Sequence, residues 1–291
     1  KLVIPSEPEE KGFGVASLTL RAGGITDAGE YDYVYPQFEL RGTFTNSAAK
    51  INYDYITDND HWYHLVLPFA GDLTTIKYPT EFYGANVAAN NTGSWQIKRY
   101  AGEIRATGNY KAWKDIETEG DTSTIAGQGY IFWGAPKKVS VNGGASTRQK
   151  WGIQRITMSV SAPDAMNAEN GDKAISELSS YANIPNKSDK DNDQGWNLIG
   201  NPYPSFYDIR FMDFTAPITV WDSYYGTYYA YSPIDDEYIL SPGEAFFVQR
   251  PVEVETITFN ANGRQTDRVV RADAETKDRE VGVDVRQVFN L

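Results

Sequence analysis

Trp62-Tyr-His-Leu-Val-Leu-Pro-Phe69 recurs without gaps as Trp196-Asn-Leu-Ile-Gly-Asn-Pro-Tyr203. Each of these two Trp blocks has an apolar centre and ends in a proline followed by an aromatic residue. Because proline lacks a backbone donor and fixes φ, each Trp block predicts a strand that ends at a rigid corner. Two such strands in one chain predict a duplicated β unit.

Two further blocks recur downstream in the same order. The glycine block Gly127-Gln-Gly-Tyr-Ile-Phe132 matches a second glycine block, Gly243-Glu-Ala-Phe-Phe-Val248. After them, Val139-Ser-Val-Asn-Gly143 matches Ile257-Thr-Phe-Asn-Ala261. A glycine turn that leads into a strand apolar on both faces is typical of a central strand in a packed sheet. Three blocks in one order indicate a duplication more strongly than any single block does.

One helix interrupts the β-rich pattern of the sequence. Asp172-Lys-Ala-Ile-Ser-Glu-Leu-Ser-Ser-Tyr-Ala182 places Ile175 and Leu178 on one helical face, with Asp172 as a candidate N-cap. Asn183-Ile-Pro185 is expected to end this helix.

Alternating stretches separated by Gly, Asn, Asp and Pro fill most of the remaining chain. We therefore predict an all-β fold of two tandem, sequence-related β-sandwich units of jelly-roll-like architecture, with one short helix between the repeat cores. The first unit is expected to cover residues 1–150. The second is expected to cover residues 151–291 and to begin with a strand and helix linker. Predicted core residues include Trp62, Trp196, Phe246 and Phe247.

Composition excludes several classes of partner and chemistry. The chain has 291 residues, of which 41% are apolar and 14% aromatic, and its formal net charge is −12. A chain this acidic is repelled by nucleic-acid phosphates and by anionic membrane surfaces, so we expect neither as a partner. With no cysteine in the sequence, disulfides and Cys-ligated zinc are excluded. No apolar run is long enough to predict membrane insertion.

The second Trp block carries a resemblance to a known group of proteins. Gly195-Trp-Asn-Leu-Ile-Gly-Asn-Pro-Tyr-Pro-Ser205 resembles a segment that recurs in large secreted and cell-surface proteins of Bacteroidota, often near the sorting region used by type IX secretion. Leu240-Ser-Pro-Gly-Glu-Ala-Phe-Phe-Val-Gln249 fits the same pattern, and residues 60–135 resemble it more weakly. Such proteins include adhesins, proteins with leucine-rich repeats and others of unknown role. The resemblance implies an extracellular or cell-surface location, and it brings no catalytic residues with it.

The sequence gives no signature of an enzyme. The two histidines, His61 and His64, point to opposite faces of a strand and are expected to form a surface pair near a turn. Nucleophile elbows, P-loops and His-Glu-x-x-His motifs are absent from the sequence. We therefore predict a chain without catalytic activity. A carbohydrate-active enzyme stays open as an alternative, because 39 Asp and Glu residues offer many carboxylate pairs.

Aromatic residues provide the candidate ligand-binding surface. Alternation along a hairpin around Gly226 sends one set of rings to the core and the other to an exposed row. Exposed rings can stack on sugars or contact another protein, whereas the alternative is ordinary cross-strand packing. The candidate ligand-contacting residues are Trp95, Tyr110, Trp113, Tyr224, Tyr225, Tyr228 and Tyr229.

An acidic stretch before the second Trp block is a candidate calcium loop. Asp189, Asp191 and Asp193 have the alternating oxygen spacing of such loops. The next residue is Gln194 where an EF-hand requires glycine, so the stretch is not an EF-hand. Calcium is therefore a possible cofactor, and a solvated charged loop is the alternative.

These observations favour a non-catalytic extracellular surface module. The leading hypothesis is an adhesin-like role in which the module binds a glycan or a protein. An architectural role, as a spacer or assembly domain that contacts other domains of a larger surface protein, is the second hypothesis. A carbohydrate-active enzyme is the third.

Overall fold

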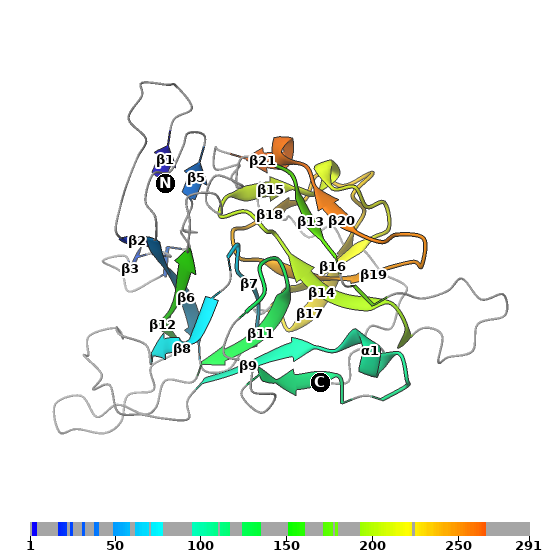
Figure 1. Ribbon diagram of the computed structural model, residues 1–291, viewed down its shortest axis with the longest axis horizontal. Coiled ribbons are helices and arrows are strands. Elements are labelled where there is room, and N and C mark those ends of the chain that lie inside the picture. The colour runs from blue at the N-terminus through cyan, green and yellow to red at the C-terminus, as the bar shows by residue number, and fades with distance from the viewer. Residues whose placement is uncertain are drawn as a thin grey trace.

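The structure is a computed structural model of the 291-residue chain (Figure 1). It describes residues 2–4, 17–21, 24–25, 31–32, 38–40, 49–58, 62–69, 71–77, 95–109, 111–116, 124–134, 151–160, 171–176, 178–179, 193–222 and 225–265. Within these ranges strands dominate, and the single α-helix is α1 (Gly102–Arg105). The predicted all-β class is therefore confirmed.

The first sheet contains the first Trp block and the first glycine block. Its strand order is β10-β9-β11-β7, and every neighbouring pair is antiparallel. Gly127 adopts the left-handed φ of 77° in the turn that precedes β11. The strands are β7 (Tyr63–Val66), β9 (Trp95–Tyr100), β10 (Trp113–Asp115) and β11 (Gly129–Gly134).

The second sheet contains the second Trp block and the second glycine block. Its strand order is β14-β19-β16-β17, again with every pair antiparallel. The apolar β19 lies between β14 and β16, which confirms the central position predicted for it. The strands are β14 (Trp196–Gly200), β16 (Ile218–Asp222), β17 (Thr227–Tyr231) and β19 (Ala245–Gln249).

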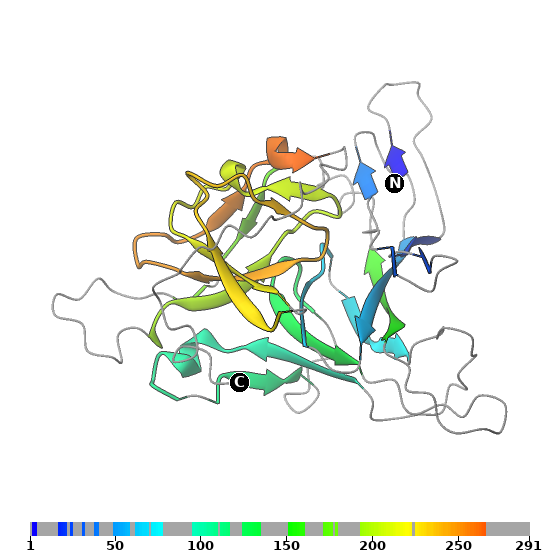
Figure 2. The ribbon, with the colours of Figure 1, turned by 180° about the vertical axis from the view of Figure 1, so that it is seen from behind.

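The two sheets pack face to face and enclose one apolar cluster, which we call the inter-sheet core (Figures 1 and 2). Phe247 is fully buried in it, as predicted. Trp62 and Trp196 pack against this cluster but stay partly exposed. The buried members are Val66, Tyr100, Ala112 and Ile131 from the first sheet and its connections, and Leu198, Ala245 and Phe247 from the second.

A second apolar cluster covers the opposite face of the second sheet. Phe246 points into it and is fully buried, as predicted. Short elements close this cluster from outside: β13 (Lys173–Ile175), β15 (Phe206–Asp208), η3 (Ile209–Phe211), β18 (Ile239–Leu240), β20 (Ile257–Phe259), η4 (Ala261–Gly263) and β21 (Arg264–Gln265).

The helix predicted over residues 172–182 is wrong where the structure describes it. Lys173–Ile175 is the strand β13, which pairs antiparallel with β20. Ile175 packs against the second apolar cluster. The backbone bonds offered by β20 and the nearby apolar surface outweigh the helical spacing of this short segment.

A further four-stranded sheet lies to one side of the two packed sheets in both views (Figures 1 and 2). Its order is β2 (Ser17–Arg21), β6 (Ala49–Asp58), β12 (Trp151–Val160) and β8 (Gly71–Lys77). β12 follows residue 150 in the chain, yet it pairs with β6 and β8. The division into units 1–150 and 151–291 stays a prediction. Two small pairs complete the described strands: β1 (Leu2–Ile4) with β5 (Phe38–Leu40), and β3 (Gly24–Ile25) with β4 (Tyr31–Asp32).

The proline corner after β14 is held by one buried amide. Asn201 Nδ2 donates to the carbonyls of Ser205, at 2.7 Å, and Ser241, at 3.2 Å. Its Oδ1 accepts from the backbone nitrogen of Tyr203 at 3.0 Å. The side chain thus supplies bonds that the two prolines of the corner cannot make.

Candidate functional site

Two of the candidate ligand-contacting rings, both half-buried, pack against the inter-sheet core. Trp113 packs edge-on against Tyr100, with centroids 5.1 Å apart, and lies 6.0 Å from Phe247. Tyr228 lies 6.1 Å from the same phenylalanine. Phe247 is therefore a hub at which rings from both sheets meet in the edge-to-face geometry that aromatic pairs prefer. Both residues thus contact the ring that lies between the sheets, and their role in ligand binding stays a prediction.

Tyr228 also belongs to a smaller group with Trp221 and His64. The Tyr228 ring lies 4.7 Å from the Trp221 ring and 5.8 Å from the His64 ring. Burial raises the pKa of the Tyr228 hydroxyl, so this phenol stays protonated near neutral pH. Trp221 Nε1 donates to the carbonyl of Trp62 at 2.9 Å, a polar link between the two sheets.

His64 is half-buried and faces the second sheet, whereas the sequence predicted a surface position. Its ring stacks on Trp221 at 6.0 Å and meets Phe247 edge-on at 5.5 Å. Burial lowers the pKa of His64 to about 3, against a smaller opposite effect of the Ala245 backbone. His61 lies outside the described residues. Strand alternation places His64 on the face of β7 that meets the second sheet, a fact that the sequence of one strand does not reveal.

Two exposed tyrosines lie on the β16–β17 hairpin. Tyr225 is 71% exposed and Tyr229 is 36% exposed. The turn is held by Asp222, whose side chain accepts from Tyr225 N at 3.0 Å and whose carbonyl accepts from Gly226 N at 2.9 Å. Gly226 has a φ of 62°, which suits glycine in a tight turn. This hairpin retains two of the candidate ligand-contacting residues.

Three other candidates are outside what the structure describes. Tyr110 and Tyr224 lie outside the described residues, and so does the side chain of Trp95.

One member of the candidate calcium loop is buried in an ion pair. Asp193 Oδ1 lies 2.6 Å from Arg105 Nη2, and the two side chains are only 12% and 4% exposed. Asp189 and Asp191 lie outside the described residues. The described part of the chain holds no group of three or more metal-ligating side chains. A calcium ion at this loop would share Asp193 with Arg105, and the calcium site stays a prediction.

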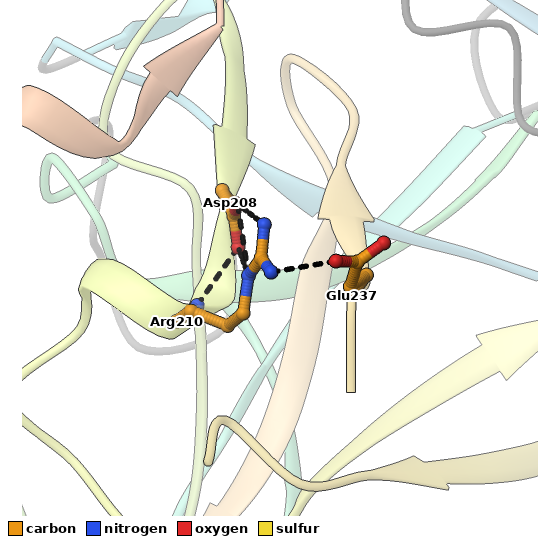
Figure 3. A network of polar contacts seen from close by, with 3 residues as sticks. All are labelled: Asp208, Arg210 and Glu237. Carbon is orange, nitrogen blue, oxygen red and sulfur yellow. Dashed lines mark hydrogen bonds and ion pairs between the residues drawn. The ribbon is translucent and has the colours of Figure 1, made fainter. Parts of the chain in front are cut away.

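A second charged network joins Asp208, Arg210 and Glu237 (Figure 3). Asp208 accepts from Arg210 Nη2 at 2.6 Å and from the Arg210 backbone nitrogen at 3.0 Å. Arg210 Nη1 also donates to Glu237 at 2.8 Å. Asp208 thereby caps η3, and Arg210 neutralises its nearly buried carboxylate. We interpret this network as structural.

The helices in the described residues include none that is long and apolar enough to cross a membrane. Comparison with known proteins finds no family model, no curated protein and no solved structure that matches this chain.

Proposed function

We propose that the chain is a non-catalytic module of an extracellular surface protein, and that its role is architectural: a rigid spacer or assembly domain within a larger protein. The observation that carries this proposal is the position of its aromatic residues. Trp113 and Tyr228, expected to contact a ligand, pack with Phe247 between the two sheets. Their contact area serves cohesion of the fold.

The inter-sheet core suits a spacer for a physical reason. A spacer must hold the orientation of the domains on either side, so its own layers must not slide or separate. Each aromatic side chain buries a large area and fixes a specific ring geometry. The link from Trp221 Nε1 to the Trp62 carbonyl adds a directional bond between the sheets. A cysteine-free chain thereby gains rigidity without disulfides.

A second candidate function is binding of a glycan or a protein at the β16–β17 hairpin. The observation that favours it is the exposure of Tyr225, 71% exposed at the hairpin turn, and of Tyr229, 36% exposed on the edge strand β17. Exposed tyrosines of this kind can stack on a sugar ring or anchor a protein contact.

A glycan-array and protein-capture screen of the whole chain, with and without calcium, separates the two roles. The architectural proposal expects no reproducible ligand. A ligand that is lost in Tyr225→Ala/Tyr229→Ala and retained in Phe211→Ala would overturn it in favour of the hairpin. Phe211 is the matched control, because it is an aromatic residue that is 42% exposed on η3, outside the hairpin. Calcium dependence lost in Asp189→Asn would assign the ion to the acidic loop.

A further inference from the structure

The two sheets meet through a reciprocal pair of backbone hydrogen bonds. Val66 N, on β7 of the first sheet, donates to the carbonyl of Gly243 in the second half at 3.0 Å. Gly200 N, on β14 of the second sheet, donates to the carbonyl of Gly127 in the first half at 3.1 Å. In each sheet, therefore, an amide of the edge strand donates to the other sheet, and a carbonyl in the turn before the central strand accepts from it.

The donors and acceptors hold equivalent places in the repeated blocks. Val66 and Gly200 are each the fifth residue of a Trp block, and Gly127 and Gly243 are each the first residue of a glycine block. The contact from the first half to the second is therefore repeated from the second half to the first. Contacts that recur with their roles exchanged are the mark of an isologous interface about a two-fold axis.

The adjacent bridge pairs obey the same exchange. Leu65 forms an antiparallel bridge with Glu244, and Ile199 forms one with Gln128. Leu65 and Ile199 are each the fourth residue of a Trp block, and Gln128 and Glu244 are each the second residue of a glycine block. Two independent backbone contacts thus follow one symmetry rule.

The equivalent turns have the same conformation. Gly127 and Gly243 have φ values of 77° and 79°. The residue after each glycine closes the same type of turn: Gln128 N donates to the carbonyl of Ile125 at 3.2 Å, and Glu244 N donates to that of Ser241 at 3.1 Å.

The pairing registers of the central strands agree as well. Tyr63 pairs with Phe132 in the first sheet, and their block equivalents Asn197 and Val248 pair in the second. On the other side of the central strand, Ile97 pairs with Phe132 and Ile218 pairs with Val248. The order β10-β9-β11-β7 therefore corresponds, strand for strand and in register, to β17-β16-β19-β14.

The outermost pair continues this correspondence into the inter-sheet core. Trp113 pairs with Tyr100 in the first sheet, and Tyr228 pairs with Trp221 in the second. Both pairs place two aromatic rings on the face that meets the other sheet. The cross-strand aromatic pair is therefore a feature of the unit that both copies retain.

The equivalent positions Val66 and Gly200 also lie against each other. A Cβ added at Gly200 would come within 2.6 Å of Val66 Cγ1. A residue meets its own counterpart only close to a two-fold axis. Near the axis a bulky side chain leaves room only for a small residue at the equivalent position. Val66 and Gly200 are such a pair.

We infer that the face enclosing the inter-sheet core is an isologous interface. The chain is two copies of one four-stranded unit packed about a pseudo-two-fold axis, and this face of either sheet fits a second copy of the same unit. The partner that each face accepts is the other copy within the chain. This inference is independent of whether the module is architectural or binds a ligand.

Engineered disulfides in the whole chain test the inference, because the sequence contains no cysteine. The first variant is Leu65→Cys with Glu244→Cys, and the second is Gln128→Cys with Ile199→Cys. In both bridge pairs the inter-sheet hydrogen bond is made by the neighbouring residues and not by the pair itself. In antiparallel strands such pairs are the closely spaced type, with Cα atoms about 4.5 Å apart. That separation suits a disulfide. Each variant replaces one buried aliphatic residue and one half-buried polar residue. Glu244→Cys also removes the bonds that this carboxylate accepts from the Tyr238 hydroxyl and from Ser241 N, so its single-cysteine variant also serves as the control for stability.

We expect both variants to form an intrachain disulfide to the same extent, as faster-migrating monomers on non-reducing gels. The four single-cysteine variants, as controls, should give no such band. Closure of one pair without the other, or disulfide-linked dimers in place of monomers, overturns the inference.

Hydrogen exchange in the unaltered chain keeps the test decisive if a cysteine variant fails to fold. The amides of Val66 and Gly200 should be protected to the same degree, both by more than about 10³-fold, since each donates in an equivalent interface bond. If either amide exchanges as fast as the exposed hairpin tip at Tyr225 while the other stays protected, the two contacts are not equivalent and the inference is wrong.

Discussion

A histidine packed between two sheets makes the stability of the fold depend on pH. The pKa of His64 in the folded chain is about 3, below its ordinary value of 6.5, because burial disfavours the charged ring. The unfolded chain therefore binds a proton as pH falls through 6.5, whereas the folded chain does not until about pH 3. The stability of the folded state is thus full above pH 6.5 and falls progressively below it.

We expect the free energy of unfolding to fall by about 1–2 kcal/mol between pH 7 and pH 5 through this group alone. His64→Leu is the matched control, because Leu198 holds the equivalent place in the second Trp block. Urea titrations of both proteins at the two pH values isolate the effect, since all other titrating groups are shared. An equal loss of stability in the two proteins would show that the ring is not held neutral.

Gly200 is a position in the contact between the sheets at which even one added methyl group should lower stability. A Cβ there meets Val66 Cγ1 of the first sheet at 2.6 Å and, within its own sheet, the Glu244 carbonyl oxygen at 2.5 Å. We expect Gly200→Ala to lower the free energy of unfolding by about 1–3 kcal/mol. In Gly108→Ala the new Cβ meets nothing within 4 Å and only a φ of 77° opposes it, so that control should cost about 1 kcal/mol. Thermal unfolding followed by tryptophan fluorescence compares the two variants.

At the scale of elements, α1 is one feature by which the two sheets differ. The connection from β9 to β10 carries this helix, whereas β16 and β17 are joined by a tight turn. Arg105 at the end of α1 reaches across to Asp193, just before β14, in a buried ion pair. A buried ion pair is weak evidence for stability but can fix which surfaces pair. The ion pair belongs to the connection that carries α1, and we expect it to help distinguish one copy from the other.

Removing one member of this pair should cost more than removing both. Asp193→Leu leaves the Arg105 guanidinium buried without its carboxylate, and we expect a loss of about 3–5 kcal/mol. Arg105→Met combined with Asp193→Leu replaces both charges with apolar groups and should recover most of that loss. A double-mutant cycle by urea denaturation measures the coupling between the two positions. Additive losses in the cycle would contradict a buried, coupled pair.

The sequence predicted which segments form strands better than it predicted what those strands pack against. The Trp blocks and glycine blocks each became paired strands, because their apolar pattern and turn chemistry are local properties. The helix expected at residues 172–182 failed at β13, since that strand depends on a partner, β20, far along the chain. The sequence predicted that Tyr228 and Tyr229 point to opposite faces of their strand. It did not predict which of these faces is covered, because that depends on the other sheet.

At the scale of the whole molecule, one strand serves two cores. Neighbouring residues of β19 are both fully buried, with Phe247 in the inter-sheet core and Phe246 in the second apolar cluster. The sheets are therefore coupled through Phe247, while Phe246 stabilises the second sheet against its own outer elements. Because Phe246 and Phe247 are identical in type and adjacent in the chain, the same substitution at each position tests the two apolar clusters separately.

Phe247→Ala should loosen the joint between the sheets, whereas Phe246→Ala should not. Both should lower the free energy of unfolding by about 3–5 kcal/mol, the usual cost of truncating a buried phenylalanine. In Phe247→Ala, however, hydrogen exchange should accelerate in β9 and β10 of the first sheet as well as in β19, because the rings of Tyr100 on β9 and Trp113 on β10 lose the ring against which they pack. In Phe246→Ala the acceleration should stay within the second sheet and β20, with which Phe246 shares its cluster. If both variants give the same exchange pattern, the two sheets unfold as one unit whichever core is weakened, and Phe247 is not the coupling residue.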